Sequence, residues 1–116
     1  MIKIPVRISA ALLAFASSVS LFAAPMAQTA SECATVADMA LVARAHAEAG
    51  IEPAKSAAIM LRIYLVETNK RGKEMMQAVI LGAQRDTHSP ADFAQGLERH
   101  CMNTQGNLDR YLGIES

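Results

Sequence analysis

The chain has 116 residues, a formal net charge of zero and a low aromatic content of 4%, with no tryptophan. This length allows a single domain at most. The neutral charge balance and the scarcity of aromatic rings exclude the two features that nucleic-acid binding needs, a basic surface and a stacking platform for bases.

The first 27 residues have the layout of a secretory signal peptide. Lys3 and Arg7 precede an uncharged run over residues 8–24, and small residues follow it. We expect cleavage after Ala27, with Ala30 as the alternative, although Pro25 is not ideal three residues before the bond. A retained membrane anchor is the other interpretation, but the run is short and contains four serines. The prediction is a periplasmic or secreted protein whose residues 28–116 form one small domain with no membrane segment.

The two cysteines, Cys33 and Cys101, can form only one intramolecular pair. An exported chain meets an oxidising compartment, which favours that disulfide. Closing so long a loop stabilises the folded state by about 4 kcal/mol in the chain-entropy model. Two free thiols or an intermolecular bridge are the alternatives.

A capping-box spacing at Thr29 and Glu32 predicts a helix over residues 30–49, which Gly50 ends in a left-handed conformation. One face of this helix is narrow and made of small or apolar residues: Cys33, Val36, Met39, Ala40, Ala43 and Ala47.

The stretch 57–66 (AAIMLRIYLV) is apolar except for Arg62. A helix that is apolar all round is buried on all sides, so we expect the central helix of the domain here, from Pro53 to Glu67 or Thr68. Arg62 either extends to solvent or faces a partner. The polar residues 69–73 predict a turn, although one long helix over 53–84 remains open, and a strand at 63–66 is a weaker alternative.

Two further helices follow. The third expected helix covers residues 73–84, and its apolar stripe consists of Met75, Met76, Val79, Ile80 and Ala83. Ser89 and Pro90 open the next helix, on which Phe93, Leu97 and Cys101 share one face. A short final helix is expected over 108–112. The predicted fold is all-α, with four helices, a short C-terminal helix and one disulfide.

No set of residues predicts a reaction or a cofactor. His100 and Met102 are the only metal-ligand candidates, beside Cys101, but adjacent helical residues point about 100° apart and cannot share one ion. Ser89 is explained as a helix cap, and Ser56 falls in the first turn of a helix with no nucleophile elbow around it. We therefore expect no catalytic, metal or cofactor residue.

The positions of Cys33, Gly50, the Ser89–Phe93 helix start and Cys101 form a pattern that resembles small exported two-cysteine helical bacterial proteins of unknown function. More loosely, the chain resembles HdeA-like periplasmic acid-stress chaperones, which are also short, helical and two-cysteine. No functional residue is carried over from either.

The function we expect is protein–protein binding, by an inhibitor, immunity factor or accessory subunit that can also form a homodimer. The candidate partner-facing residues are basic: Arg62, Lys70, Arg71 and Lys73. The alternatives are an acid-stress chaperone that opens at low pH through its histidines and carboxylates, and a metal or small-molecule carrier.

Overall fold

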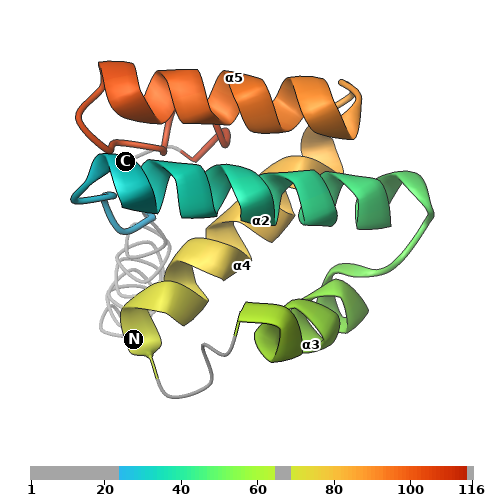
Figure 1. The fold of residues 1–116 in the computed structure, drawn as a ribbon. Coiled ribbons are helices and arrows are strands. Elements are labelled where there is room, and N and C mark those ends of the chain that lie inside the picture. The colour runs from blue at the N-terminus through green and yellow to red at the C-terminus, as the bar shows by residue number, and fades with distance from the viewer. Residues whose placement is uncertain (1–23, 65–68, 115–116) are drawn as a thin grey trace, which may run out of the picture.

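The computed structural model describes residues 24–64 and 69–114. Within these ranges it contains four helices and no strand, namely α2 (Ala30–Glu48), α3 (Pro53–Tyr64), α4 (Lys70–Arg85) and α5 (Pro90–Asn103). Figure 1 shows α2 and α5 lying antiparallel side by side, with α4 crossing α2 at a steep angle and α3 on the far side of α2 from α5. The predicted all-α fold is confirmed.

Helix α2 begins and ends as its sequence predicts. The Thr29 side chain accepts a hydrogen bond from the Glu32 amide at 3.1 Å, and the Glu32 carboxylate accepts one from the Gln28 amide at 2.7 Å. At the other end Gly50 adopts a positive φ of 79°, and the Ile51 amide donates to the His46 carbonyl at 2.9 Å. This is the Schellman arrangement, which satisfies the last helical carbonyls.

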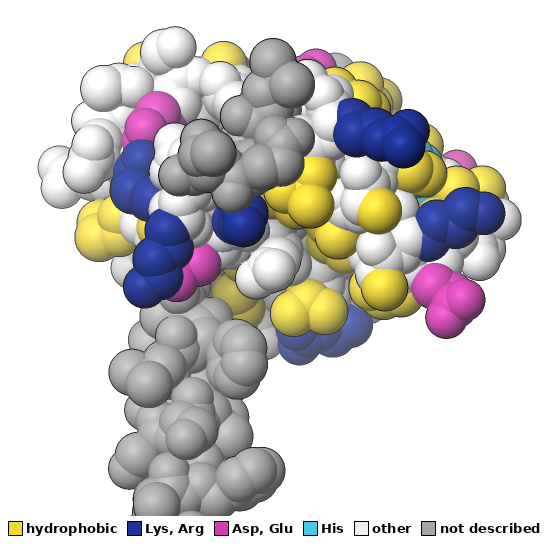
Figure 2. Space-filling view, turned by 90° about the horizontal axis from the view of Figure 1, so that it is seen from below, with side chains coloured by type: hydrophobic (Ala, Val, Ile, Leu, Met, Phe, Trp, Pro, Cys, Tyr) yellow, Lys and Arg dark blue, Asp and Glu magenta, His cyan; other side chains and the backbone are white. Residues whose placement is uncertain are grey.

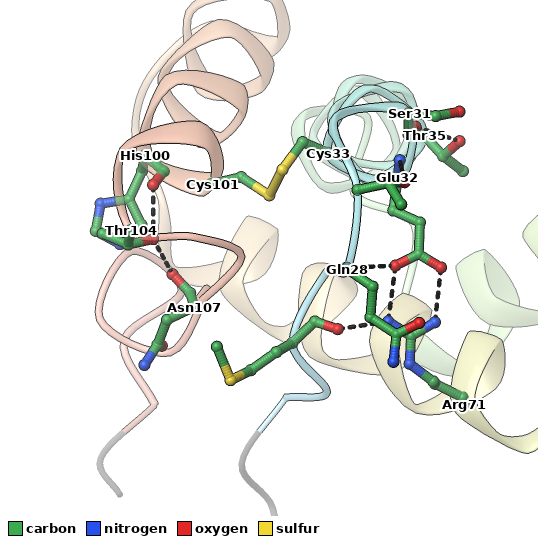
Figure 3. Close-up of a disulfide and its surroundings, with 12 residues drawn as sticks. Gln28, Ser31, Glu32, Cys33, Thr35, Arg71, His100, Cys101, Thr104 and Asn107 are labelled. Carbon is green, nitrogen blue, oxygen red and sulfur yellow. Dashed lines mark hydrogen bonds and ion pairs between the residues drawn. A yellow bond between two sulfur atoms is a disulfide. The ribbon is translucent and has the colours of Figure 1, made fainter.

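The predicted disulfide between Cys33 and Cys101 is present and both cysteines are buried. It joins the first turn of α2 to the last turn of α5 (Figure 3). The small residues of α2 let the neighbouring helices approach closely. The largest fully buried side chains come mainly from α2, α4, α5 and the C-terminal segment: Phe93, Met60, Met76, Leu97, Leu108, Leu112, Val36 and Val79.

The predicted central helix is wrong. Helix α3 lies at the edge of the domain, where only Ser56 and Met60 are buried and Ile63 is 53% exposed. The central helix is α2, whose alanines pack against both α4 and α5. An apolar helical wheel shows that a helix can be buried on every side, but burial also needs neighbours on every side. Among the described residues, α3 has neighbours on one side.

The C-terminal part of the helix predicted from Pro53 is described only as far as Tyr64. Helix α3 is helical through Ile63 and Tyr64, so the strand alternative is wrong at these two residues. The remaining predicted helical residues, 65–68, lie outside the described residues.

The turn predicted over residues 69–73 is wrong as well, because α4 begins at Lys70. Asn69 is its N-cap, and the Asn69 side chain accepts a hydrogen bond from the Gly72 amide at 3.0 Å. Gly72 therefore belongs to the first helical turn, where the cap offsets its low helix propensity. The backbone of Asn69 is extended, so the alternative of one long helix over 53–84 is wrong. The predicted buried stripe of α4 is confirmed.

Helix α5 starts as predicted, with the Ser89 side chain accepting from the Asp92 amide at 3.2 Å. The expected helix over 108–112 is instead a series of turns that Gly113 ends with a φ of 75°. Only five residues separate Asn107 from Gly113, too few for a helix to repay its nucleation cost. Leu108 and Leu112 are nevertheless buried, so this segment completes the core.

Residues 24–28, which we call the N-terminal strap, pack on the C-terminal end of the domain. Ala24 and Ala27 are buried, and the Ala27 amide donates to the Gly106 carbonyl at 2.9 Å. Gly106 has no room for a side chain, since a Cβ there would lie 1.9 Å from the Ala27 carbonyl oxygen. The packed part of the chain thus begins before the predicted boundary at Gln28.

Candidate functional site

Helix α3 is held to the domain by its inner face. Met60 is fully buried, and the Ser56 hydroxyl lies 2.8 Å from Nδ1 of His46 on α2. At the C-terminal end the Tyr64 hydroxyl donates to the Asp38 carboxylate at 2.7 Å. Burial, with the Asp38 carboxylate beside it, raises the pKa of Tyr64, so the hydroxyl keeps its proton and this hydrogen bond at alkaline pH as well. These contacts fix the orientation of α3 and therefore of its opposite face.

That opposite face, which we call the α3 outer face, consists of Lys55, Ala58, Ile59, Arg62 and Ile63. Their spacing of three and four residues places them on one side of a helix. Ile63 is among the most exposed large apolar residues of the described chain, and Ile59 is half-buried. The face combines apolar and basic side chains, and α3 contains no acidic residue.

The charge of the chain is unevenly distributed around this face. Residues 51–85 carry six basic and three acidic side chains, whereas residues 28–50 and 86–116 together carry three basic and eight acidic ones. Figure 2, which views the molecule from below, shows hydrophobic side chains between Lys and Arg side chains on both sides. Within the described residues, no ion pair involves Lys55 or Arg62. Both side chains are exposed at the surface of α3.

The basic residues around the start of α4 differ in their surroundings. Lys70 is almost fully exposed and lies 3.7 Å from the Glu74 carboxylate, while Lys73 is half-buried. Arg71 donates to both Glu32 carboxylate oxygens at 2.7 Å and to the Met26 carbonyl (Figure 3). Arg71 thus joins α4 to the start of α2 and to the N-terminal strap. Of the four predicted partner-facing residues, Arg62 and Lys70 are exposed and Lys73 is half-buried. Arg71 is bound to Glu32 within the domain.

This ion pair predicts how stability depends on pH. The Arg71 guanidinium, through its hydrogen bonds, lowers the pKa of Glu32 from 4.5 to about 2. A carboxylate whose pKa is lower in the folded state stabilises the fold above its unfolded pKa and loses that contribution as pH falls through the folded one. We expect the melting temperature to fall between pH 4.5 and about 2, and Glu32→Gln to flatten that fall. Thermal unfolding by circular dichroism measures it, with the exposed Glu98→Gln as control; equal slopes in all three proteins contradict the assignment.

A buried arginine lies on α2. Arg44 of α2 is 8% exposed, and its Nε donates to the His88 carbonyl at 2.8 Å and lies 3.6 Å from the Asp86 carboxylate. Asp86 also accepts from the His88 amide at 2.7 Å, and its hydrogen bond to the imidazole raises the pKa of His88. This cluster fixes the loop between α4 and α5 against α2. Arg62, the arginine singled out in the sequence, is exposed.

The sequence candidates for catalysis and metal binding are Ser56, Ser89, His100 and Met102. Ser56 and His46 form a hydrogen-bonded pair, but Ser56 is 1% exposed, so a substrate cannot reach its hydroxyl. The His100 ring lies on the Tyr111 ring at 5.5 Å between centroids, and Met102 is exposed. No group of three or more His, Cys, Asp or Glu side chains suited to a metal ion occurs in residues 24–64 and 69–114.

Two features of the site were not evident in the sequence. The outer face of α3 was predicted to be buried, whereas no feature of the sequence predicts the burial of Arg44, since its partners Asp86 and His88 lie far along the chain. Among the described residues, no helix has the length and hydropathy needed to cross a membrane.

Comparison of the chain with protein-family models, curated proteins and solved structures finds no match.

Proposed function

We propose that the chain is a small exported protein that acts by binding another protein through the α3 outer face, as an inhibitor, immunity factor or accessory subunit. The observation that carries this proposal is the exposure of apolar side chains on a helix that uses only Ser56 and Met60 as fully buried contacts. Exposed apolar residues grouped on one surface, with polar residues around them, mark interaction sites.

The partner surface is expected to be acidic and to contain an apolar depression. Lys55 and Arg62 flank Ile59 and Ile63, and a carboxylate on the partner would pair with each base while the isoleucines are covered. An anionic membrane is a less suitable partner, because helices that lie in a membrane interface usually use Trp, Phe and Leu, and the outer face has none of these.

Charge reversal at the outer face tests this proposal. We expect Lys55→Glu with Arg62→Glu to weaken partner binding by roughly ten- to a hundredfold, because two attractive pairs become repulsive. Both side chains are exposed, so the melting temperature should stay close to that of the wild type. Binding is measured by isothermal titration calorimetry with the partner that crosslinking at Ile63 identifies.

The matched control is Arg99→Glu with Arg110→Glu, which makes the same change in net charge at exposed positions outside α3. An equal loss of affinity in both double variants would show a general charge effect and contradict a specific surface. Binding of the wild type to vesicles of anionic phospholipid, but to no protein, would also contradict the proposal and favour a membrane-surface role.

A further inference from the structure

The N-terminal strap begins with an unusual contact. The Ala24 amide donates a hydrogen bond to Oδ1 of Asp109 at 2.9 Å, across 85 residues of sequence. Asp109 lies in the C-terminal turns and Ala24 is 9% exposed. A carboxylate directed at a backbone nitrogen is suitably placed to bind a positively charged α-amino group once the chain is cut at that nitrogen.

We infer that the export peptidase cuts the bond between Ala23 and Ala24, and that the new α-ammonium of Ala24 pairs with Asp109. This inference rests on the export part of the proposed function. In the reaction, water adds across the amide bond. Its hydroxyl joins the Ala23 carbonyl carbon, the carbon–nitrogen bond breaks, and the Ala24 nitrogen takes up protons to become an ammonium. The contact then changes from a hydrogen bond to an ion pair without movement of the nitrogen.

The alternative cuts remove parts of the packed structure. Cleavage after Ala27 would take away the buried side chains of Ala24 and Ala27, leave the Gly106 carbonyl without its 2.9 Å donor and remove the Met26 carbonyl from Arg71. Cleavage after Ala30 would in addition remove the N-cap Thr29. A cut after Ala23 removes none of these contacts.

The sequence around the proposed bond meets one of the two requirements of signal peptidases. Ala23 is the small residue required directly before the cut, whereas the third residue before it is Leu21, which is larger than usual there. A cut one residue later would place Pro25 directly after the bond and would remove the nitrogen that Asp109 contacts.

The test is intact mass spectrometry of the full chain after expression in an exporting bacterium and recovery from the envelope fraction. We expect the mass of an oxidised chain that begins at Ala24. A chain that begins at Gln28 or Ser31, or one that keeps Met1, overturns the inference. The binding proposal is measured separately, by the affinity of the α3 variants, so each can fail without the other.

A second measurement tests the ion pair itself. In the chain that begins at Ala24, acetylation of the α-amino group is expected to lower the melting temperature, because it removes the charge that faces Asp109. The same acetylation should change the melting temperature much less in Asp109→Asn, and as much as in the wild type in the control Glu98→Gln. Equal shifts in all three proteins overturn the assignment of Asp109 as the partner of the new N-terminus.

Discussion

Replacing both cysteines, Cys33→Ala with Cys101→Ala, is expected to lower the free energy of unfolding by about 4 kcal/mol. The disulfide closes a loop with a sequence separation of 68 residues. Without this link the unfolded chain gains conformational entropy, so unfolding becomes more favourable. For a domain of this size, the melting temperature should fall by roughly 15–30 °C.

Thermal unfolding by circular dichroism measures this change, and the reduced wild type is the matched control. Because both cysteines are buried, alanine also removes packing, whereas reduction keeps the sulfur atoms and breaks only the link. We expect reduction of the wild type to produce most of the fall in melting temperature that the alanine variant shows. A melting temperature that differs by only a few degrees between the oxidised and the reduced protein would contradict the role of the disulfide.

Phe93→Ala is expected to destabilise the fold by about 3–5 kcal/mol, through lost transfer energy and the cavity that remains. Phe93 is 1% exposed, and its ring lies 5.7 Å from the Tyr111 ring between centroids. Its carbonyl also accepts a hydrogen bond from the Tyr111 hydroxyl at 3.1 Å. The substitution removes the ring contact between α5 and the C-terminal turns but leaves this carbonyl in place.

Met102→Ala is the control for that substitution, because Met102 lies on the same helix and is 54% exposed. We expect a change within about 0.5 kcal/mol for this variant. Urea unfolding followed by circular dichroism gives both values. Similar losses for the two variants would contradict the role of the core around Phe93, because alanine does not lower the helix propensity of α5.

Much of the fold follows from local sequence features. The helix caps at Thr29, Gly50 and Ser89 were predicted because short side chains and glycine act on neighbouring backbone groups. The link between Cys33 and Cys101 was predicted because two cysteines allow one intramolecular pair. Each of these predictions needs only the residues next to a helix end or the number of cysteines in the chain.

The features that were missed depend on distant contacts. Whether Ile63 is buried depends on which helices pack beside α3, and the hydropathy of α3 alone does not give that. Arg44 can be buried because the loop at Asp86 and His88 supplies a carboxylate and a carbonyl from about 40 residues away. The polar residues beside Asn69 predict a turn, but the Asn69 side chain is equally suited to the N-cap position that it occupies.

The site was predicted only in part for the same reason. Arg62 was recognised as exceptional within an apolar run, but its neighbours on the outer face could not be assigned until the buried face of α3 was known. Arg71 was grouped with Lys70 and Lys73 as a basic cluster. The structure separates it from them, because Glu32 binds it across 39 residues.

The most direct test of the binding proposal is photo-crosslinking in living cells, with a photoreactive phenylalanine analogue in place of Ile63 or of Met102. The two positions are equally exposed, at 53% and 54%, but only Ile63 lies on the α3 outer face. We expect position 63, and not position 102, to give a discrete adduct with one protein through an acidic segment, and Lys55→Glu with Arg62→Glu to abolish it. Adducts of equal yield at both positions, or none at position 63, would contradict the proposed function.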